Sequence, residues 1–169
     1  MCIRDRTLAG DIDVYAELDG TPYAGPIACA PGEKVTFDYT ELERGMHVFS
    51  EYTIADGHKS PVLTREFFIG VDTPSAPARV TFHQQETVFA VWDEVTTGAH
   101  GGYIDLEDLS YNVYINGEFY GKSDTFYLDN IELPDDITMS LYSASVTAVS
   151  GGYESTPTYS HEIAYGKPF

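Results

Sequence analysis

The sequence predicts an all-β protein made of two tandem β-sandwiches, of which the first is incomplete. Three observations support this fold class. Short runs rich in Val, Tyr, Phe and Thr alternate apolar with polar residues, as half-buried strands do. Turn-forming pairs such as Asn116-Gly117 separate these runs, and no segment of about a dozen residues holds a helical period. The chain also repeats itself once.

The internal repeat sets the number of modules. The segment from Ile54 to Ser60 reads like the segment from Val149 to Ser155, and each precedes a strand-like run that ends in glycine. Further matches lie upstream: Val14-Tyr15 with Val113-Tyr114, and Gly20-Thr21-Pro22-Tyr23 with Gly117-Glu118-Phe119-Tyr120. The offset between the copies lies between roughly 91 and 99 residues, the size of one β-sandwich module. Two such modules are typical of an array.

The strand-like runs follow one another in a defined order. In the first copy they span 12–17, 35–39, 48–54 and 64–69. In the second copy they span 78–83, 87–92, 110–115, 125–128, 140–149 and 160–165. The run at 12–17 matches the third run of the second copy, so we expect the first module to hold strands C to G of a seven-strand sandwich. The best helix candidate is a single turn at 105–108.

The expected domain boundaries follow from the repeat. The hexapeptide 1–6 fits neither copy and resembles a translated sequencing adapter, so we expect a non-native leader there. Residues 7–72 form the truncated module one, and 78–166 form the complete module two. Two prolines restrict the backbone in 73–77, which we expect to be a short, stiff linker.

The second copy also predicts its own core. Alternate residues of a strand share a face, so Val88, Ala90 and Trp92 point the same way, as do Tyr111 and Val113 on the next strand. The run at 140–149 adds Tyr142, Ala144, Val146 and Ala148. Trp92 is expected at the centre of the core. The Tyr142 hydroxyl is expected to form a hydrogen bond with the backbone, an arrangement called a tyrosine corner.

These core residues resemble the pattern of fibronectin type III domains, a family with an immunoglobulin-like sandwich fold. The resemblance is closest to the domains strung along secreted surface proteins of gut-type bacteria. Such domains often carry a Gly-Gly-Tyr element, matched by Gly101-Gly102-Tyr103, and a Tyr-Asn-Val-Tyr run into a hairpin, matched at 111–117. The resemblance implies tandem modules of a secreted, multidomain bacterial protein, located outside the cell or on its surface.

Charge and cysteine content exclude several classes of function. The net charge is −18, and residues 76–166 carry two basic against fourteen acidic side chains. Such a surface repels phosphate, so we expect no nucleic-acid partner and no binding to anionic membranes. The sequence contains no apolar segment long enough to span a membrane, so we expect no membrane insertion. The two cysteines, Cys2 and Cys29, are too few for a secreted disulfide scaffold.

The sequence offers no catalytic motif and no cofactor motif. The five histidines show no metal-ligand spacing, and no Gly-x-Ser-x-Gly elbow occurs. We therefore expect no catalytic residues, no cofactor and no enzyme activity. Calcium is the best metal candidate, because Asp105, Glu107 and Asp108 share one loop and calcium prefers oxygen ligands. The alternative is a solvated acidic loop.

Aromatic side chains supply the remaining functional hint. The candidates for ligand contact are Tyr114, Phe119, Tyr120, Tyr153 and Tyr159. They could stack on a sugar or a protein partner, or they could cover sheet edges and joints. We expect non-catalytic spacer or adhesion modules that present neighbouring domains of the same polypeptide or bind a protein weakly. The alternative is a carbohydrate-binding accessory module of a secreted glycan-degrading enzyme.

Overall fold

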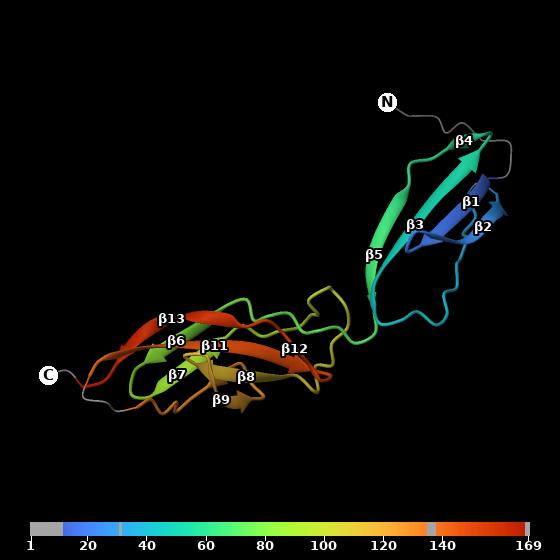
Figure 1. The fold of residues 1–169 in the computed structure, drawn as a ribbon. Helices are drawn as coiled ribbons and strands as arrows, with labels where there is room; N and C mark the ends of the chain where they lie inside the picture. Colours follow the sequence, from blue (N-terminus) through green and yellow to red (C-terminus); the bar gives the residue numbers. More distant parts are fainter. Residues whose placement is uncertain (1–11, 31, 135–137, 168–169) are drawn as a thin grey trace. The chain divides into compact units, whose positions relative to one another are not determined.

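The structure, a computed structural model, describes residues 12–30, 32–134 and 138–167. The described residues form strands, turns and loops without any helix, so the helical turn considered at 105–108 is replaced by bends. The chain divides between Ile69 and Gly70 into two compact units (Figure 1), which we call module one and module two. The predicted leader, 1–6, lies outside the described residues. No helix in the described part is long and apolar enough to cross a membrane.

Module one is built around one antiparallel sheet. Its strands are β1 (Ile12–Leu18), β2 (Thr21–Cys29), β3 (Gly45–Ala55), β4 (His58–Lys59) and β5 (Leu63–Ile69). Their order is β2-β1-β3-β4, and β5 also pairs with β3. Val14, Ala16 and Cys29 are the buried hydrophobic residues in the described part of this module.

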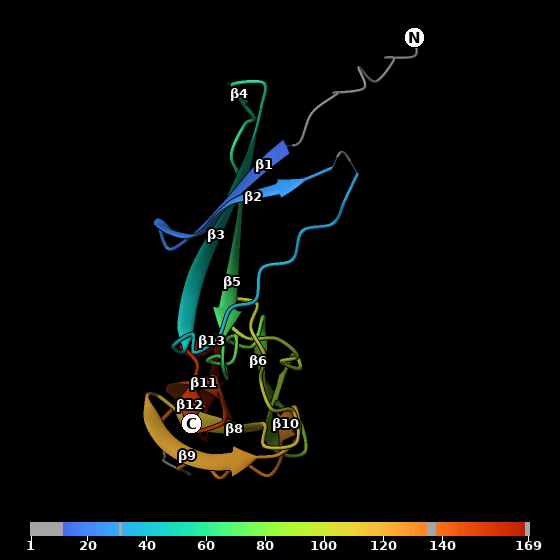
Figure 2. The same ribbon diagram turned by 90° about the vertical axis from the view of Figure 1, so that its right-hand side faces the viewer.

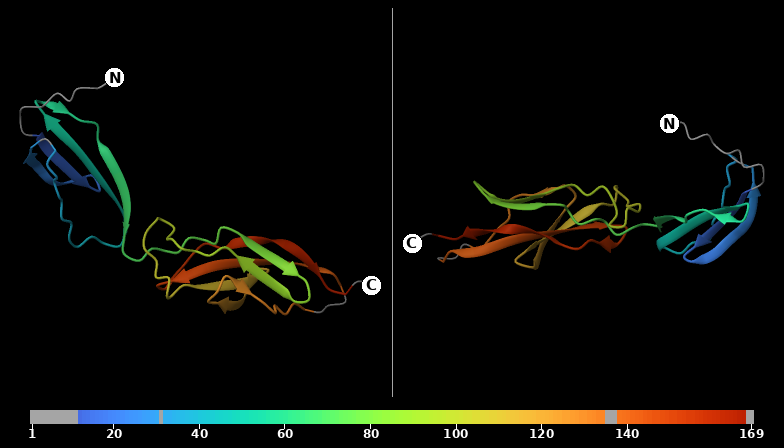
Figure 3. Two further views of the ribbon diagram at one scale, coloured as in Figure 1. Left: turned by 180° about the vertical axis from the view of Figure 1, so that it is seen from behind. Right: turned by 90° about the horizontal axis from the view of Figure 1, so that it is seen from above.

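Module two is a two-layer sandwich. One sheet has the order β10-β7-β6, from Tyr127–Leu128, Val88–Trp92 and Val80–Gln84. The other has the order β12-β11-β8-β9, with β13 also paired to β11, from Tyr153–Glu154, Ser140–Ser150, Ser110–Ile115, Glu118–Ser123 and Thr158–Tyr165. Figure 2 shows β6 and β10 on one side and β8, β9 and β11 on the other. The two layers are also separate in the view from above in Figure 3.

The core of module two lies between these sheets. Trp92 is 3% exposed, and its ring centroid lies 5.4 Å from that of Tyr111. All the residues expected to face inward are buried: Val88, Ala90, Trp92, Tyr111, Val113, Tyr142, Ala144, Val146 and Ala148. The expected tyrosine corner is not formed, because the Tyr142 hydroxyl makes no hydrogen bond within the described part of the chain. Instead the Val95 N–H donates to the Tyr111 hydroxyl at 3.0 Å.

Matching turns correct the alignment of the two repeats. Asp19 and Gly20 both have positive φ, as do Asn116 and Gly117, and each pair joins two neighbouring strands. A two-residue turn fixes the register of its hairpin. Counting back from the turns, Ala16 rather than Val14 is the counterpart of Val113, so the match of Val14-Tyr15 to Val113-Tyr114 was wrong by two residues.

The segment 35–39 forms no strand, contrary to the expectation from its alternating sequence. It does alternate in burial: Val35, Phe37 and Tyr39 are half-buried and the residues between them are exposed. The rings of Phe37 and Tyr39 lie 6.1 and 5.9 Å from Phe49. In module two the strand at this place in the chain order, β10, pairs with β7. The described part of module one contains no counterpart of β7, so no strand described there pairs with the segment.

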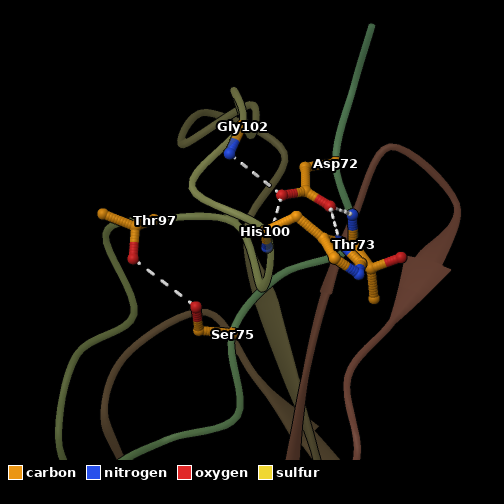
Figure 4. A network of polar contacts seen from close by, with 6 residues as sticks. All are labelled: Asp72, Thr73, Ser75, Thr97, His100 and Gly102. Carbon is orange, nitrogen blue, oxygen red and sulfur yellow. Dashed lines mark hydrogen bonds and ion pairs between the residues drawn. The ribbon is translucent and has the colours of Figure 1, made fainter. Parts of the chain in front are cut away.

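The segment expected to be a linker packs on module two. Val71 and Pro74 form bridges with Tyr103 and Gly98, and Pro74 and Pro77 are fully buried. The carboxylate of Asp72, which is 0% exposed, accepts hydrogen bonds from the His100 ring and from the N–H groups of Thr73, His100 and Gly102, at 2.7–3.0 Å (Figure 4). Residues 70–77 therefore belong to module two, because these contacts bind them to the loop at 97–103.

Candidate binding site on the outer sheet of module two

One row of side chains crosses the solvent-facing side of the larger sheet of module two. Tyr114 of β8 lies opposite Phe119 of β9 and opposite Ser145 of β11, and Ser145 lies opposite Tyr159 of β13. Directly opposed residues share a face of the sheet. The rings of Tyr114 and Phe119 meet edge to face with centroids 5.8 Å apart. Phe119 and Tyr159 are 57% and 67% exposed, so the row presents aromatic surface to solvent.

A fixed carboxylate lies beside this row. Glu154, the last residue of β12, accepts three hydrogen bonds at the same oxygen, Oε1. The donors are Asn112 Nδ2 and the Tyr114 hydroxyl, both at 2.9 Å, and the Thr147 hydroxyl at 2.5 Å. They come from β8 and β11, so the carboxylate is held over the middle of the sheet. Asn112 and Thr147 are buried beneath it although they lie on the outer face.

These contacts keep the carboxylate ionised. The hydrogen bond from Thr147 and then that from Asn112 lower the pKa of Glu154, and together with Tyr114 and the nearby charge of Lys122 they outweigh the opposing effect of burial. The pKa of Tyr114 moves the other way. Burial raises it first, and the hydrogen bond to the Glu154 carboxylate raises it further. At neutral pH the pair is therefore a carboxylate and a protonated phenol.

Tyr114 and Tyr159 of the aromatic row, but not Phe119, line a cleft of about 410 Å³ together with the carboxylate. Its lining residues are Tyr114, Gly117, Ser145, Thr147, Glu154, Ser155, Pro157 and Tyr159. The volume is within the roughly 300–1,000 Å³ typical of ligand pockets. A larger hollow of about 560 Å³ lies at the β6–β7 turn, but among its described lining residues no carboxylate is fixed by several donors. The cleft on the outer sheet is therefore the better candidate site.

The structure brings together three of the five predicted aromatic residues. Tyr114, Phe119 and Tyr159 belong to the row described above. Tyr120 follows Phe119 on β9, and its hydroxyl accepts a hydrogen bond from the Glu132 N–H at 2.7 Å. Tyr153 lies opposite Ser150 and precedes Glu154, and successive strand residues point to opposite faces. Neither Tyr120 nor Tyr153 lines the cleft.

The three calcium candidates do not gather into a metal site. Asp105 Oδ1 accepts the Glu107 N–H at 3.0 Å, and Asp108 Oδ2 accepts the Gly151 N–H at 2.8 Å. The Asp105 carboxylate thus supports its own loop, and that of Asp108 ties the loop to the turn between β11 and β12. Across the described residues, no group of three or more His, Cys, Asp or Glu side chains is placed to hold a metal ion.

Sequence reasoning missed the polar part of the site. The alternation that places Ala144, Val146 and Ala148 in the core also places Ser145 and Thr147 outward, and this signal was present in the sequence. No such signal identified Glu154, because its three donors lie 7 to 42 residues away along the chain.

No protein-family model and no curated protein matches the chain. Solved structures do. The chicken interferon gamma receptor alpha chain has 12% identity and a TM-score of 0.44, covering 95% of this chain and 87% of its own. A two-domain fibronectin type III segment of chicken tenascin has 14% identity and a TM-score of 0.39, covering 92% and 84%. The fibronectin(III)-like modules of Clostridium thermocellum CbhA have 14% identity and a TM-score of 0.35, covering 98% and 82%.

The assignment of the fold rests on the strand order. In module two, a sheet of three strands packs against a sheet of five. In chain order, β6, β7 and β10 of the smaller sheet correspond to strands A, B and E of the sandwich. In the larger sheet β8, β9 and β11 correspond to C, C′ and F, and β12 with β13 correspond to a divided strand G. This is the sandwich architecture expected for module two. Module one repeats the order of the larger sheet, with β2-β1-β3-β4 in place of β9-β8-β11-β12.

Proposed function

We propose that this chain is a pair of non-catalytic modules in a larger secreted or cell-surface bacterial protein. The modules space or present neighbouring domains and make weak protein contacts. The observation that carries the proposal is the repetition of one sheet order in two units along the chain, the arrangement of modular arrays. The acidic surface agrees with an exposed, soluble role.

The chemistry of the cleft supports a role without catalysis. A general acid must hold a proton near neutral pH, and a useful general base has a pKa near the working pH. The contacts of Glu154 lower its pKa, which makes it poor at both tasks. A nucleophile needs a hydrogen-bonded base. Within the described residues the Ser145 hydroxyl has none, and the Thr147 hydroxyl donates to Glu154, whose lowered pKa makes it a weak base.

Two experiments test this proposal. The purified chain is incubated with panels of peptide, ester and glycoside substrates, and no turnover is expected; turnover that Glu154→Gln abolishes would contradict the non-catalytic role. In the full-length polypeptide, residues 12–166 are then replaced by two unrelated β-sandwich domains of similar length. A spacer role predicts that the neighbouring domains keep their activity and surface exposure.

A carbohydrate-binding accessory module is the second candidate, and the aromatic row favours it. Rings on neighbouring strands can stack on a sugar chain that lies across a sheet. A glycan array tests this with two variants. Tyr159→Ala removes an exposed ring from the row, and Tyr127→Ala removes a ring of similar exposure, 52%, from the opposite sheet. Glycan binding at the row predicts a loss with the first variant and none with the second.

A further inference from the structure

Three side-chain donors beside Glu154 are already engaged. Asn112 Nδ2, the Tyr114 hydroxyl and the Thr147 hydroxyl all donate to Glu154 Oε1. The protons of the two hydroxyls and one N–H of the Asn112 amide therefore point at the carboxylate rather than at the cleft. A bound molecule would find few donors among the described residues that line this surface.

Acceptors, in contrast, remain available. Glu154 Oε2 takes part in no hydrogen bond within the described part of the chain, and Glu154 itself is exposed. Asn112 Oδ1 also has no hydrogen-bond partner, but this atom is buried and is not open to a ligand. The Ser145 hydroxyl, in the floor of the cleft, can accept as well as donate. The site thus has an excess of acceptors, one of them charged.

The electrostatic field has the same sign as this carboxylate. The nearest cation that acts on Glu154 is Lys122, but Glu154 takes part in none of the ion pairs found among the described residues. Residues 76–166 contain two basic against fourteen acidic side chains. A negative surface of this kind raises the local concentration of cations.

We propose that the cleft binds the guanidinium group of an arginine side chain on a partner protein. A guanidinium carries five N–H donors and no acceptor, which complements a site rich in acceptors. It is also planar and stacks on aromatic faces, and Tyr114 and Tyr159 supply rings at the two sides of the Ser145 position. A sugar hydroxyl both donates and accepts, so its oxygen would find fewer partners here than its proton, and a lysine ammonium has no plane to stack.

This inference rests on the proposed role in weak protein contacts and names the group that is recognised. The test is an NMR titration of the isotope-labelled full chain with N-acetyl-arginine-N-methylamide. Saturable shifts are expected at Tyr114, Ser145, Glu154 and Tyr159, with a dissociation constant on the order of 1 mM, since an exposed single ion pair is weak. The citrulline analogue, which has the same shape without charge, is expected to cause no saturable shift.

Two matched variants locate the binding. Glu154→Gln keeps an oxygen for the three internal donors but places an N–H₂ where Oε2 lies, so affinity for the arginine probe is expected to fall at least about tenfold. Glu162→Gln removes the same charge from an exposed position of β13, opposite Ser143 and outside the cleft, and is expected to change affinity less than about twofold. Circular dichroism checks that both variants fold.

Three results would overturn the inference: equal binding of arginine and citrulline probes, unchanged affinity in Glu154→Gln, or equal losses in the two variants. Should Glu154→Gln fail to fold, Tyr159→Ala takes its place, because this ring is 67% exposed, and unchanged affinity would then reject the site. Saturable shifts with oligosaccharides but not with arginine would favour the carbohydrate-binding alternative. Failure of the arginine site leaves the spacer role intact, since the domain-replacement experiment tests that role separately.

Discussion

Gly98 lies so close to Asp72 that a Cβ atom at position 98 would collide with the Asp72 carboxylate. Asp72 is fully buried and accepts four hydrogen bonds, which join the start of module two to the loop at 97–103. The absence of a side chain at position 98 is therefore what lets the carboxylate reach its donors, and this contact, rather than a free linker, begins module two.

Gly98→Ala is expected to destabilise module two by about 1–3 kcal/mol, because backbone and carboxylate must shift to relieve the collision. Urea unfolding followed by tryptophan fluorescence measures this, since Trp92 is the single tryptophan of the chain and reports module two alone. Gly121→Ala is the control: its added Cβ would lie 3.9 Å from Leu128, an ordinary contact. Equal effects of the two substitutions would show that the collision is not the cause.

Asp72 makes the stability of module two depend on pH. Burial acts to raise the pKa of the Asp72 carboxyl, but hydrogen bonds from the His100 ring and three backbone N–H groups outweigh it, so the pKa is below its ordinary 3.8. A group with a lowered pKa stabilises the fold above its unfolded pKa, and this contribution is lost as pH falls through the folded pKa.

We therefore expect Asp72→Asn to lower the unfolding free energy of module two by at least about 2 kcal/mol at pH 7. In this variant an N–H₂ group replaces one carboxylate oxygen and meets the N–H donors whose hydrogen bonds that oxygen accepted. The difference in unfolding free energy between the two proteins should narrow as pH falls below about 4, because the Asp72 carboxyl of the unfolded wild-type chain then becomes protonated while that of the folded chain is still ionised. Trp92 fluorescence in urea series at pH 7, 5, 4 and 3 measures both curves. A gap that stays constant down to pH 3 would contradict the assignment.

Trp92→Ala is expected to cost module two about 3–5 kcal/mol, the usual range for a large aromatic residue removed from a core. Because the variant lacks the fluorescent probe, hydrogen exchange of β7, β8 and β11 is the measurement. Phe126→Ala serves as the control, since this neighbouring ring is 50% exposed and its backbone carbonyl, which accepts the backbone N–H of Trp92, is unchanged. Wild-type exchange rates in the Trp92 variant would place the ring outside the core.

Amide hydrogen exchange is expected to be faster in module one than in module two. The described part of module one has three buried hydrophobic residues, whereas one cluster of fifteen forms the core of module two. Local opening needs less free energy where less apolar surface is buried. Protection factors of β3 and β11, the central strands of the two modules, give the comparison. Similar protection in a dilute monomer would contradict it.

The core of module two could be predicted from sequence, and its polar contacts could not. The alternation of inward and outward residues in 88–92 and 140–149 predicted the core residues correctly, because the periodicity of a strand is a local property of the chain. The Asp72 contacts span about 30 residues, and two prolines near Asp72 gave the stronger local signal of a linker. The Glu154 site needed the register of β8 against β11, which sequence alternation does not specify.

The sequence by itself determined the turns, the strand faces and the two-module plan. Pairs such as Asp19-Gly20 and Asn116-Gly117 adopt positive φ because steric preference there is a property of the residues themselves. Only the tertiary structure decided that 35–39 forms no strand and that Glu154 becomes a fixed carboxylate. A strand needs a neighbour to hydrogen-bond, and a carboxylate needs donors brought from other strands. Both depend on which distant segments meet, and that is settled by packing rather than by local preference.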